Sequence, residues 1–232
     1  MTALRHSPAP DAPYDLRRGH SLWHRLATDT RYTLLGLPAA LLHFAVVVAG
    51  VSAGLGAAVV FIGLPILAAT AAAARNLADF ERVALPGVLG RPVARPPYPP
   101  APAWAGWFRR TMNPLANGQA ALDLLYGVIA FPISLAASVV AAVWWTGALA
   151  GLTFPLYGWI IAALPGVDQT LPELLGLGGD DTTFVVFNTA IGVVFALTLV
   201  PVVRGAALVK ASLAQAMLTR APAPFADRMT AG

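Results

Sequence analysis

The sequence predicts an all-α membrane protein with four transmembrane helices, arranged as two hairpins with both termini in the cytoplasm. Of 232 residues, 57% are hydrophobic and only 11% are charged, whereas soluble globular proteins carry about 25% charged residues. All fifteen Lys and Arg residues fall within 1–31, 75–110 and 204–228, and residues 32–74 and 111–203 have none. Because short loops rich in Lys and Arg stay in the cytoplasm, the basic stretches are expected inside. Each charge-poor stretch must then leave the cytoplasm and return.

The first charge-poor stretch, 32–74, has the length of two crossings. A spanning helix needs about 20 apolar residues, so we expect helices over about 33–52 and 56–74. A cluster of glycines at their junction supplies the turn. Almost nothing of this hairpin is then exposed on the outer side.

Polar, proline-rich segments surround the hydrophobic helices. Residues 1–20 and 221–232 are predicted to be disordered cytoplasmic tails, which leaves 21–220 as one four-helix membrane domain. Residues 21–31 are expected to form a short interfacial helix. Residues 86–103 hold seven prolines, which is typical of a stiff, extended linker.

The second charge-poor stretch contains two strong apolar runs, about 124–146 and 184–203, and a third run, 148–164, interrupted by Pro155. If the third run also crossed the membrane, the chain would have five spans. The basic C-terminal stretch would then lie outside, against the preference of Lys and Arg for the cytoplasm. We therefore expect four spans, and predict that the extra outer segment 147–183 is interfacial or re-entrant.

The two halves share a pattern that indicates a duplicated hairpin. Three residue types recur with identical spacing, 94 positions apart, at the starts of the first and third spans: Asp29, Tyr32 and Pro38, then Asp123, Tyr126 and Pro132. Because both copies start and end inside, the repeat is parallel rather than inverted. The two aspartates are predicted to cap their helices, where a carboxylate accepts free N–H groups.

Prolines fall in the cytoplasmic half of each predicted span: Pro38, Pro65, Pro132 and Pro201. Proline inside a helix removes a backbone hydrogen bond and leaves a carbonyl without its partner. One interpretation is a ring of hinges that passes outer events to the inner face. The other is that proline is simply frequent in membrane helices.

Two groups of residues are candidates for sensing or ligand binding. His43 is the only ionisable side chain deep in a predicted span, which makes it a candidate proton or ligand sensor; a neutral histidine hydrogen-bonded between helices is the alternative. The second group forms an aromatic floor with an acidic rim at the expected outer face, suited to a cationic or amphipathic ligand: Trp144, Trp145, Tyr157, Trp159, Asp168 and Glu173. An aromatic belt at the bilayer interface would place the same aromatics there.

The sequence carries no recognisable catalytic pattern, so we expect neither an enzyme nor a cofactor. There is no Walker sequence, no G-x-S-x-G and no H-E-x-x-H, and the glycine-rich piece at 176–179 follows no strand. The absence of cysteine excludes disulfides and cysteine-ligated metal, and no metal site is predicted. Because the basic charge flanks apolar spans, we expect the lipid bilayer as a partner and not nucleic acid.

Three segments carry a resemblance to a known family: D-T-R-Y-T-L-L-G-L-P at 29–38, V-F-I-G-L-P-I-L at 60–67 and A-R-N-L-A-D-F-E-R at 74–82. They resemble the sensor domain of actinobacterial membrane proteins, a four-helix membrane unit often fused to the histidine kinases of two-component systems. The resemblance covers about 20–220 and implies detection of an envelope or membrane signal. It implies no particular ligand residues.

The expected function is therefore a stand-alone membrane sensor or signalling subunit. Only twelve residues follow Arg220, too few for a kinase module, so the signal is expected to pass to a protein partner such as a two-component kinase, or through a homo-oligomer. Residues 205–220 contain good helix formers and could extend the fourth span into the cytoplasm as a docking element. A small transporter-associated or structural subunit is the alternative.

Overall fold

The computed structural model describes residues 22–58, 62–96, 102, 104, 106–116, 118–164 and 171–219. Within these residues every regular element is helical, which confirms the all-α prediction. The four long helices are α1 (Leu22–Gly56), α2 (Gly63–Leu89), α4 (Gly118–Ala162) and α6 (Asp181–Leu218). The short ones are α3 (Trp107–Met112), the 3-10 helix η2 (Asn113–Ala116) and α5 (Leu171–Leu174).

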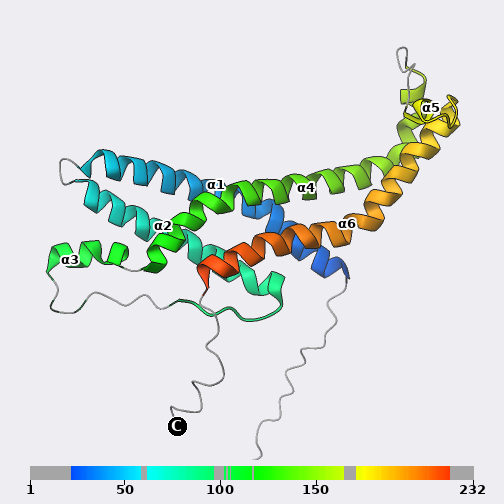
Figure 1. Ribbon diagram of the computed structural model, residues 1–232. Coiled ribbons are helices and arrows are strands. Elements are labelled where there is room, and N and C mark those ends of the chain that lie inside the picture. The colour runs from blue at the N-terminus through cyan, green and yellow to red at the C-terminus, as the bar shows by residue number, and fades with distance from the viewer. Residues whose placement is uncertain are drawn as a thin grey trace, which may run out of the picture.

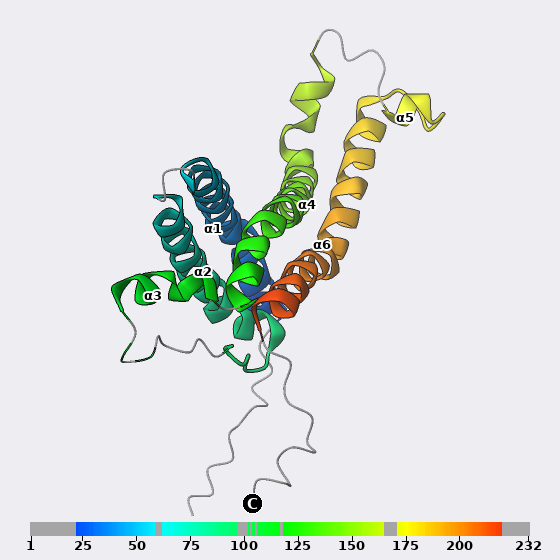
Figure 2. The same ribbon diagram turned by 60° about the vertical axis from the view of Figure 1, so that its left-hand side comes forward.

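The long helices form two antiparallel hairpins, α1–α2 and α4–α6, which meet near one end and diverge towards their tips (Figures 1 and 2). In Figure 2 the start of α1, the end of α2, the start of α4 and the end of α6 all lie in the lower part of the structure, whereas Figure 1 shows the starts of α1 and α4 apart from each other. We call this end the base. Each hairpin therefore begins and ends on the same side of the bundle.

At the base, α1 crosses α4 in the opposite chain direction. Ser138 Oγ donates a hydrogen bond to the Thr33 carbonyl at 2.8 Å, and further along α1 the His43 ring lies against Gly127. Position 127 has no room for a side chain, since a Cβ there would lie 2.7 Å from His43 Cδ2. This part of the α1–α4 contact thus combines a glycine without room for a side chain and a hydrogen bond to the backbone.

Glycines also let α4 and α6 pack closely along the second hairpin. A Cβ on Gly192 would collide with the backbone of Gly151, and a Cβ on Gly147 would lie 2.8 Å from Cδ1 of Phe195. In lipid, apolar burial gives helices little reason to associate, so close van der Waals contact of this kind holds them together.

Alanines together with a few larger side chains fill the junction of the hairpins, while many large apolar side chains face outward. The buried junction consists of Tyr32, Ala78, Leu85, Val88, Tyr126, Ala130, Ala207, Ala211, Ala214 and Leu218. By contrast, the Leu156 and Leu197 side chains are 81% and 74% exposed. A large apolar exterior of this kind marks a surface made for a non-aqueous neighbour.

Among the described helices, three are long and apolar enough to cross a membrane: α1, α4 and α6. The prediction of a fourth span over 56–74 holds only in part, because α2 begins at Gly63 and then continues through a charged second half. That half carries Arg75, Asp79, Glu81 and Arg82.

Residues 147–162 do not form an element of their own, as the predicted end of the third span at 146 had implied, and the interfacial or re-entrant position of the outer segment 147–183 stays a prediction. α4 continues unbroken through Pro155 to Ala162. Near the proline, the Tyr157 hydroxyl donates a hydrogen bond to the Ala150 carbonyl at 3.0 Å. At 1.5 Å per residue this helix of 45 residues is about 67 Å long, roughly twice the thickness of a bilayer's hydrocarbon core.

The predicted caps Asp29 and Asp123 do not begin helices. α1 starts at Leu22 and α4 at Gly118, so both aspartates lie more than a turn inside. Residues 22–31 are accordingly the first turns of α1 and not a separate interfacial helix. Both aspartates instead form ion pairs with arginines of the other hairpin.

Three of the four predicted hinge prolines lie inside helices, namely Pro38 in α1, Pro132 in α4 and Pro201 in α6. Pro65 instead lies in the first turn of α2, where backbone N–H groups have no partner within the helix, so it removes no hydrogen bond. The hinge interpretation therefore does not apply to Pro65. The interior proline of α2 is Pro86.

Candidate functional site

Six ionisable side chains meet at the base, three from each hairpin. We call them the interhairpin charge cluster: Asp29, Glu81 and Arg82 from the first hairpin, and Asp123, Arg204 and Lys210 from the second. They form three ion pairs, and each pair joins one hairpin to the other. Three acids and three bases balance, so the cluster as a whole is formally neutral. All six residues flank the predicted apolar spans on the side rich in Lys and Arg.

Arg82 makes the most deeply buried pair. Its Nη2 atom lies 2.6 Å from Asp123 Oδ1, and the two side chains are 1% and 0% exposed. The same guanidinium donates through Nε to the Leu218 carbonyl at 2.8 Å and through Nη1 to Asp79 at 2.7 Å. A planar guanidinium with several fixed donors suits such a junction. Arg82 thereby ties α2 to both helices of the second hairpin.

Lys210 extends from α6 into the space between α1 and α2. Its Nζ atom lies 3.3 Å from Glu81 Oε1 and 4.0 Å from the centre of the Tyr32 ring, a cation–π distance. The Tyr32 hydroxyl donates to the same carboxylate at 2.6 Å. Gly36 leaves the room for this amine, because a Cβ there would collide with Nζ.

The third pair joins Asp29 to Arg204, with Asp29 Oδ1 2.8 Å from Arg204 Nη1. Asp29 is buried, whereas the Arg204 side chain is 38% exposed. The pair is reciprocal to Arg82–Asp123: in each, an aspartate from the first helix of one hairpin meets an arginine from the second helix of the other. Two copies related by a twofold axis would produce this arrangement, although the duplication itself stays a prediction.

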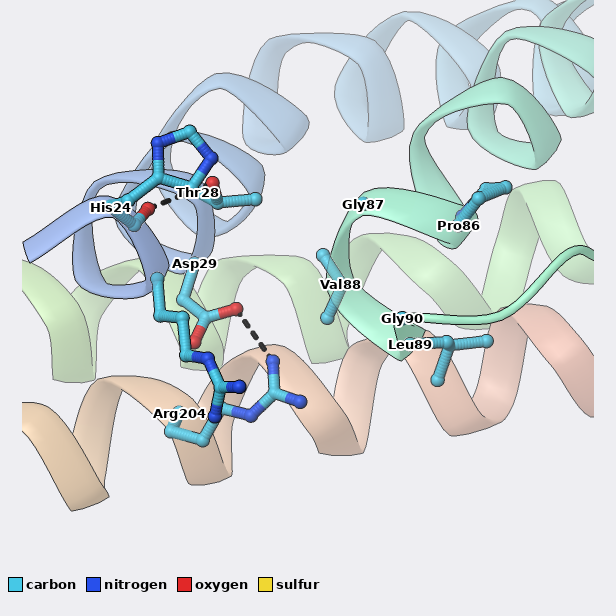
Figure 3. Close-up of a pocket in the computed structure, with 10 residues that line it drawn as sticks. His24, Thr28, Asp29, Pro86, Gly87, Val88, Leu89, Gly90 and Arg204 are labelled. Carbon is cyan, nitrogen blue, oxygen red and sulfur yellow. Dashed lines mark hydrogen bonds and ion pairs between the residues drawn. The ribbon is translucent and has the colours of Figure 1, made fainter. Parts of the chain in front are cut away.

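A cavity of about 340 Å³ opens beside the Asp29–Arg204 pair (Figure 3). We call it the basic pocket. It is lined by His24, Arg25, Thr28 and Asp29 of α1, by Pro86–Gly90 at the end of α2, and by Arg204 of α6. Two guanidinium groups and one carboxylate therefore face it, which leaves a net positive charge.

Buried ion pairs of this kind fix geometry more than they add stability. The cost of removing both charges from water roughly offsets their attraction, but deleting one partner of a buried pair costs about 3–5 kcal/mol. The interhairpin charge cluster therefore makes alternative packings of the two hairpins costly unless the charges find new partners.

His43 lies in the α1–α4 interface, beyond the cluster. It is 3% exposed, and its ring centre lies 5.8 Å from that of Tyr126. Within the described part of the chain, His43 Nε2 and Ser134 Oγ are buried without a hydrogen-bond partner. Proton or ligand sensing by His43 stays a prediction.

The structure separates the aromatic residues predicted to form an outer binding floor. Trp145 Nε1 donates to Thr30 Oγ1 at 3.1 Å, in the first turns of α1. Tyr157 and Trp159 lie more than ten residues further along the continuous α4, about 18–21 Å away at 1.5 Å per residue. The four aromatic residues therefore do not form one surface.

The remaining members of the predicted outer site are also apart. Trp144 Nε1 donates to Thr198 Oγ1 at 3.0 Å and packs edge-on to Phe195, which assigns it to the α4–α6 interface. Glu173 lies in the short α5 near the second tip, and Asp168 lies outside the described residues. The described residues give no composite ligand site at this place.

Sequence reasoning missed Glu81, Arg82 and Lys210, because charged residues beyond apolar spans usually face water. The sequence does contain a pattern that could have indicated a buried position for Lys210. Ala207, Ala211, Ala214 and Leu218 recur at helical spacing with Lys210 on the same face, and all are buried. Residues 205–218 do continue α6, but this buried face packs within the base and is not a free docking surface.

Long apolar helices in two hairpins, joined at one end by buried ion pairs, define a helical membrane protein with an internal polar joint. Residues 32–218 match the family described as "Putative sensor". The chain therefore belongs to this sensor family, as the three sequence segments indicated. No characterised protein and no solved structure shows a significant match to the chain. Five of the six cluster residues lie within the matched range.

Proposed function

We propose that the chain is a membrane sensor or signalling subunit that crosses the cell membrane four times, with both termini in the cytoplasm. Membership of the sensor family supports a sensing role. Each hairpin begins and ends at the base, so a first hairpin whose α1 crosses can return only through α2. The basic stretches also lie at the ends of the helices that form the base, and Lys and Arg favour the cytoplasmic side.

The observation that carries this proposal is the position of the three interhairpin ion pairs. They lie at the base, while the tips of the hairpins diverge (Figure 1). A signal acting on the tips would change the angle between the hairpins and so strain the pairs. Because buried ion pairs are made or broken rather than gradually stretched, such a joint can convert a small movement into two discrete states.

The output of this switch would appear at the ends of α2 and α6. Arg91, just after α2, donates to Gln215 of α6 at 2.9 Å, and Arg82 holds the last carbonyl of α6. A change of pairing would therefore move both ends together. In this proposal they act on a cytoplasmic or membrane partner such as a two-component kinase, or on a second copy of the chain, without chemistry or a cofactor of their own.

The proposal is tested by separating signalling from folding. In the native host, Asp123→Asn should alter the transcriptional response to envelope stress, normalised to the amount of protein found in the membrane. Exchanging the partners, Arg82→Asp with Asp123→Arg, should restore the response at least in part. A response identical to wild type in Asp123→Asn would contradict the sensor role. A change confined to solute uptake would instead favour a transporter-associated subunit.

A further inference from the structure

The basic pocket adjoins a second, apolar cavity along the surface of the first hairpin. This apolar groove measures about 390 Å³ and shares His24, Thr28 and Val88 with the basic pocket. Its other walls include Leu35 and Phe80. The two cavities therefore share a wall, with guanidinium groups lining one cavity and mainly apolar side chains lining the other.

The charged end has the chemistry of a phosphate site. Arg25 and Arg204 both line it, and guanidinium groups bind phosphate oxygens through paired, charge-assisted hydrogen bonds. Asp29 is the single carboxylate in the lining and already accepts a hydrogen bond from Arg204 Nη1. That bond uses only one of the five N–H donors of Arg204, so the other donors can bind phosphate oxygens while the bond holds the guanidinium group in place. Arg31, in the groove wall, adds a further positive charge.

The apolar end has the dimensions of a lipid chain. From His24 to Leu35 the groove follows α1 for eleven residues, which is about 16 Å at 1.5 Å per residue. One leaflet of the hydrocarbon core is about 15 Å deep. Leu35 and Phe80 are 64% and 69% exposed, as side chains in contact with acyl chains would be. The order along α1, basic first and apolar deeper, matches the order of a lipid in its leaflet.

We propose that this composite site binds an anionic glycerophospholipid, with its phosphate on Arg25 and Arg204 and one acyl chain in the apolar groove. The lipid would contact α1, α2 and α6 at the place where Asp29–Arg204 joins the hairpins. Binding would therefore stabilise the arrangement in which the two hairpins meet. This site stands on its own geometry and does not depend on the sensor proposal.

Native mass spectrometry of the full chain in a neutral detergent tests the proposal. Phosphatidylglycerol should bind at least about tenfold more tightly than phosphatidylcholine of the same chain length. Arg25→Gln should weaken phosphatidylglycerol binding about tenfold, the value of one charge-assisted contact. Arg109→Gln removes the same charge from an exposed side chain that lies over Trp104, so it should leave binding unchanged.

Three results would overturn the assignment. Equal affinity for the two lipids would exclude recognition of net charge, and equal losses in Arg25→Gln and Arg109→Gln would show only general attraction to a basic surface. Inorganic phosphate that binds as tightly as the lipid would make this a soluble-anion pocket. If circular dichroism shows that Arg25→Gln perturbs the fold, Arg25→Lys is tested in its place. Lysine keeps the charge but lacks the planar guanidinium fork, so a smaller loss of phosphatidylglycerol affinity is expected.

Discussion

Arg82 and Asp123 form a buried ion pair between the two hairpins, with 2.6 Å between Nη2 and Oδ1. The same arginine also contacts Asp79, whose side chain is 38% exposed. One guanidinium thus has one buried and one water-accessible carboxylate. This contrast within a single residue allows the contribution of burial to be measured directly.

Asp123→Ala should lower the free energy of unfolding by about 3–5 kcal/mol, because it leaves Arg82 buried without its nearest counter-charge. Asp79→Ala is the matched control and should cost less than about 1 kcal/mol, since an exposed partner is screened by water. Equilibrium unfolding of the detergent-solubilised protein in SDS measures both. Equal losses for the two variants would show that burial of the Asp123 pair has no special role.

Lys210 and Glu81 should be energetically coupled. Lys210→Met alone leaves Glu81 with tyrosine hydroxyls but without a counter-charge, and Glu81→Gln alone leaves the buried ammonium group with the Tyr32 carbonyl and ring but without a counter-charge. Together the two substitutions remove both charges, so the double variant should be more stable than the sum of the single losses predicts. A double-mutant cycle by thermal unfolding measures this coupling. Additive losses would mean that the pair at 3.3 Å does not interact in solution.

Packing of the second hairpin should depend on Gly192. In Gly192→Leu the side chain would collide with the α4 backbone at Gly151, so the melting temperature in detergent should fall by several degrees. Gly205→Ala is the control on the same helix, because its Cβ would meet nothing within 4 Å. Alanine favours the helix over glycine by about 1 kcal/mol, so this variant should be unchanged or more stable.

Topology can be measured by cysteine labelling, because the natural chain has no cysteine. Ala94→Cys lies just beyond α2 on the base side, and Leu177→Cys lies between α5 and α6 near the second tip. In intact cells an impermeant maleimide should label only Leu177→Cys, whereas both should react after the membrane is broken. Labelling of Ala94→Cys from outside would contradict the proposed orientation.

Asp180 should make the start of α6 sensitive to acid. Its carboxylate accepts hydrogen bonds from the Thr183 hydroxyl and backbone N–H, which lower the pKa of Asp180 below its usual value of 3.8. A carboxylate with a lowered folded-state pKa stabilises the fold above the unfolded pKa, and this contribution is lost as the pH falls through the folded pKa.

Asp180→Ala should therefore be less stable than wild type at pH 7, and the difference should narrow towards pH 3. Asp180→Asn should retain most of the cap at both pH values, since asparagine also caps helices well. Thermal melts at the two pH values distinguish them. A difference between wild type and Asp180→Ala that does not change with pH would rule out a role for the ionised carboxylate.

The sequence predicts much of the helical architecture, because the lengths of the apolar runs indicate the long helices and the positions of Lys and Arg indicate where each hairpin begins and ends. It misplaces the ends of helices. Pro155 suggests a break, yet α4 continues to Ala162, and Asp29 and Asp123 resemble caps but lie inside their helices. For the two aspartates a tertiary contact, such as the pairing of Asp123 with Arg82, overrides a local preference.

The cluster itself could not be predicted from local patterns. Asp29 meets Arg204, 175 positions away, and periodicity within one helix says nothing about which helix will face it. The outer aromatic site fails for the same reason, because Trp145 turns towards Thr30 at the base rather than towards the tip. Residue types indicated the chemistry, but only the packing of the hairpins determined the partners.

The reciprocal ion pairs have a consequence for how the protein is made. Considered alone, the first hairpin brings two acids and one base to the cluster, and the second brings two bases and one acid. While the ribosome is still synthesising α4 and α6, Asp29, Glu81 and Arg82 have no interhairpin partners. In the proposed four-span topology the newly inserted first hairpin would keep them near the headgroups, because unpaired charges are costly to bury. Final docking is then a late step of biogenesis, in which each half completes the charge balance of the other.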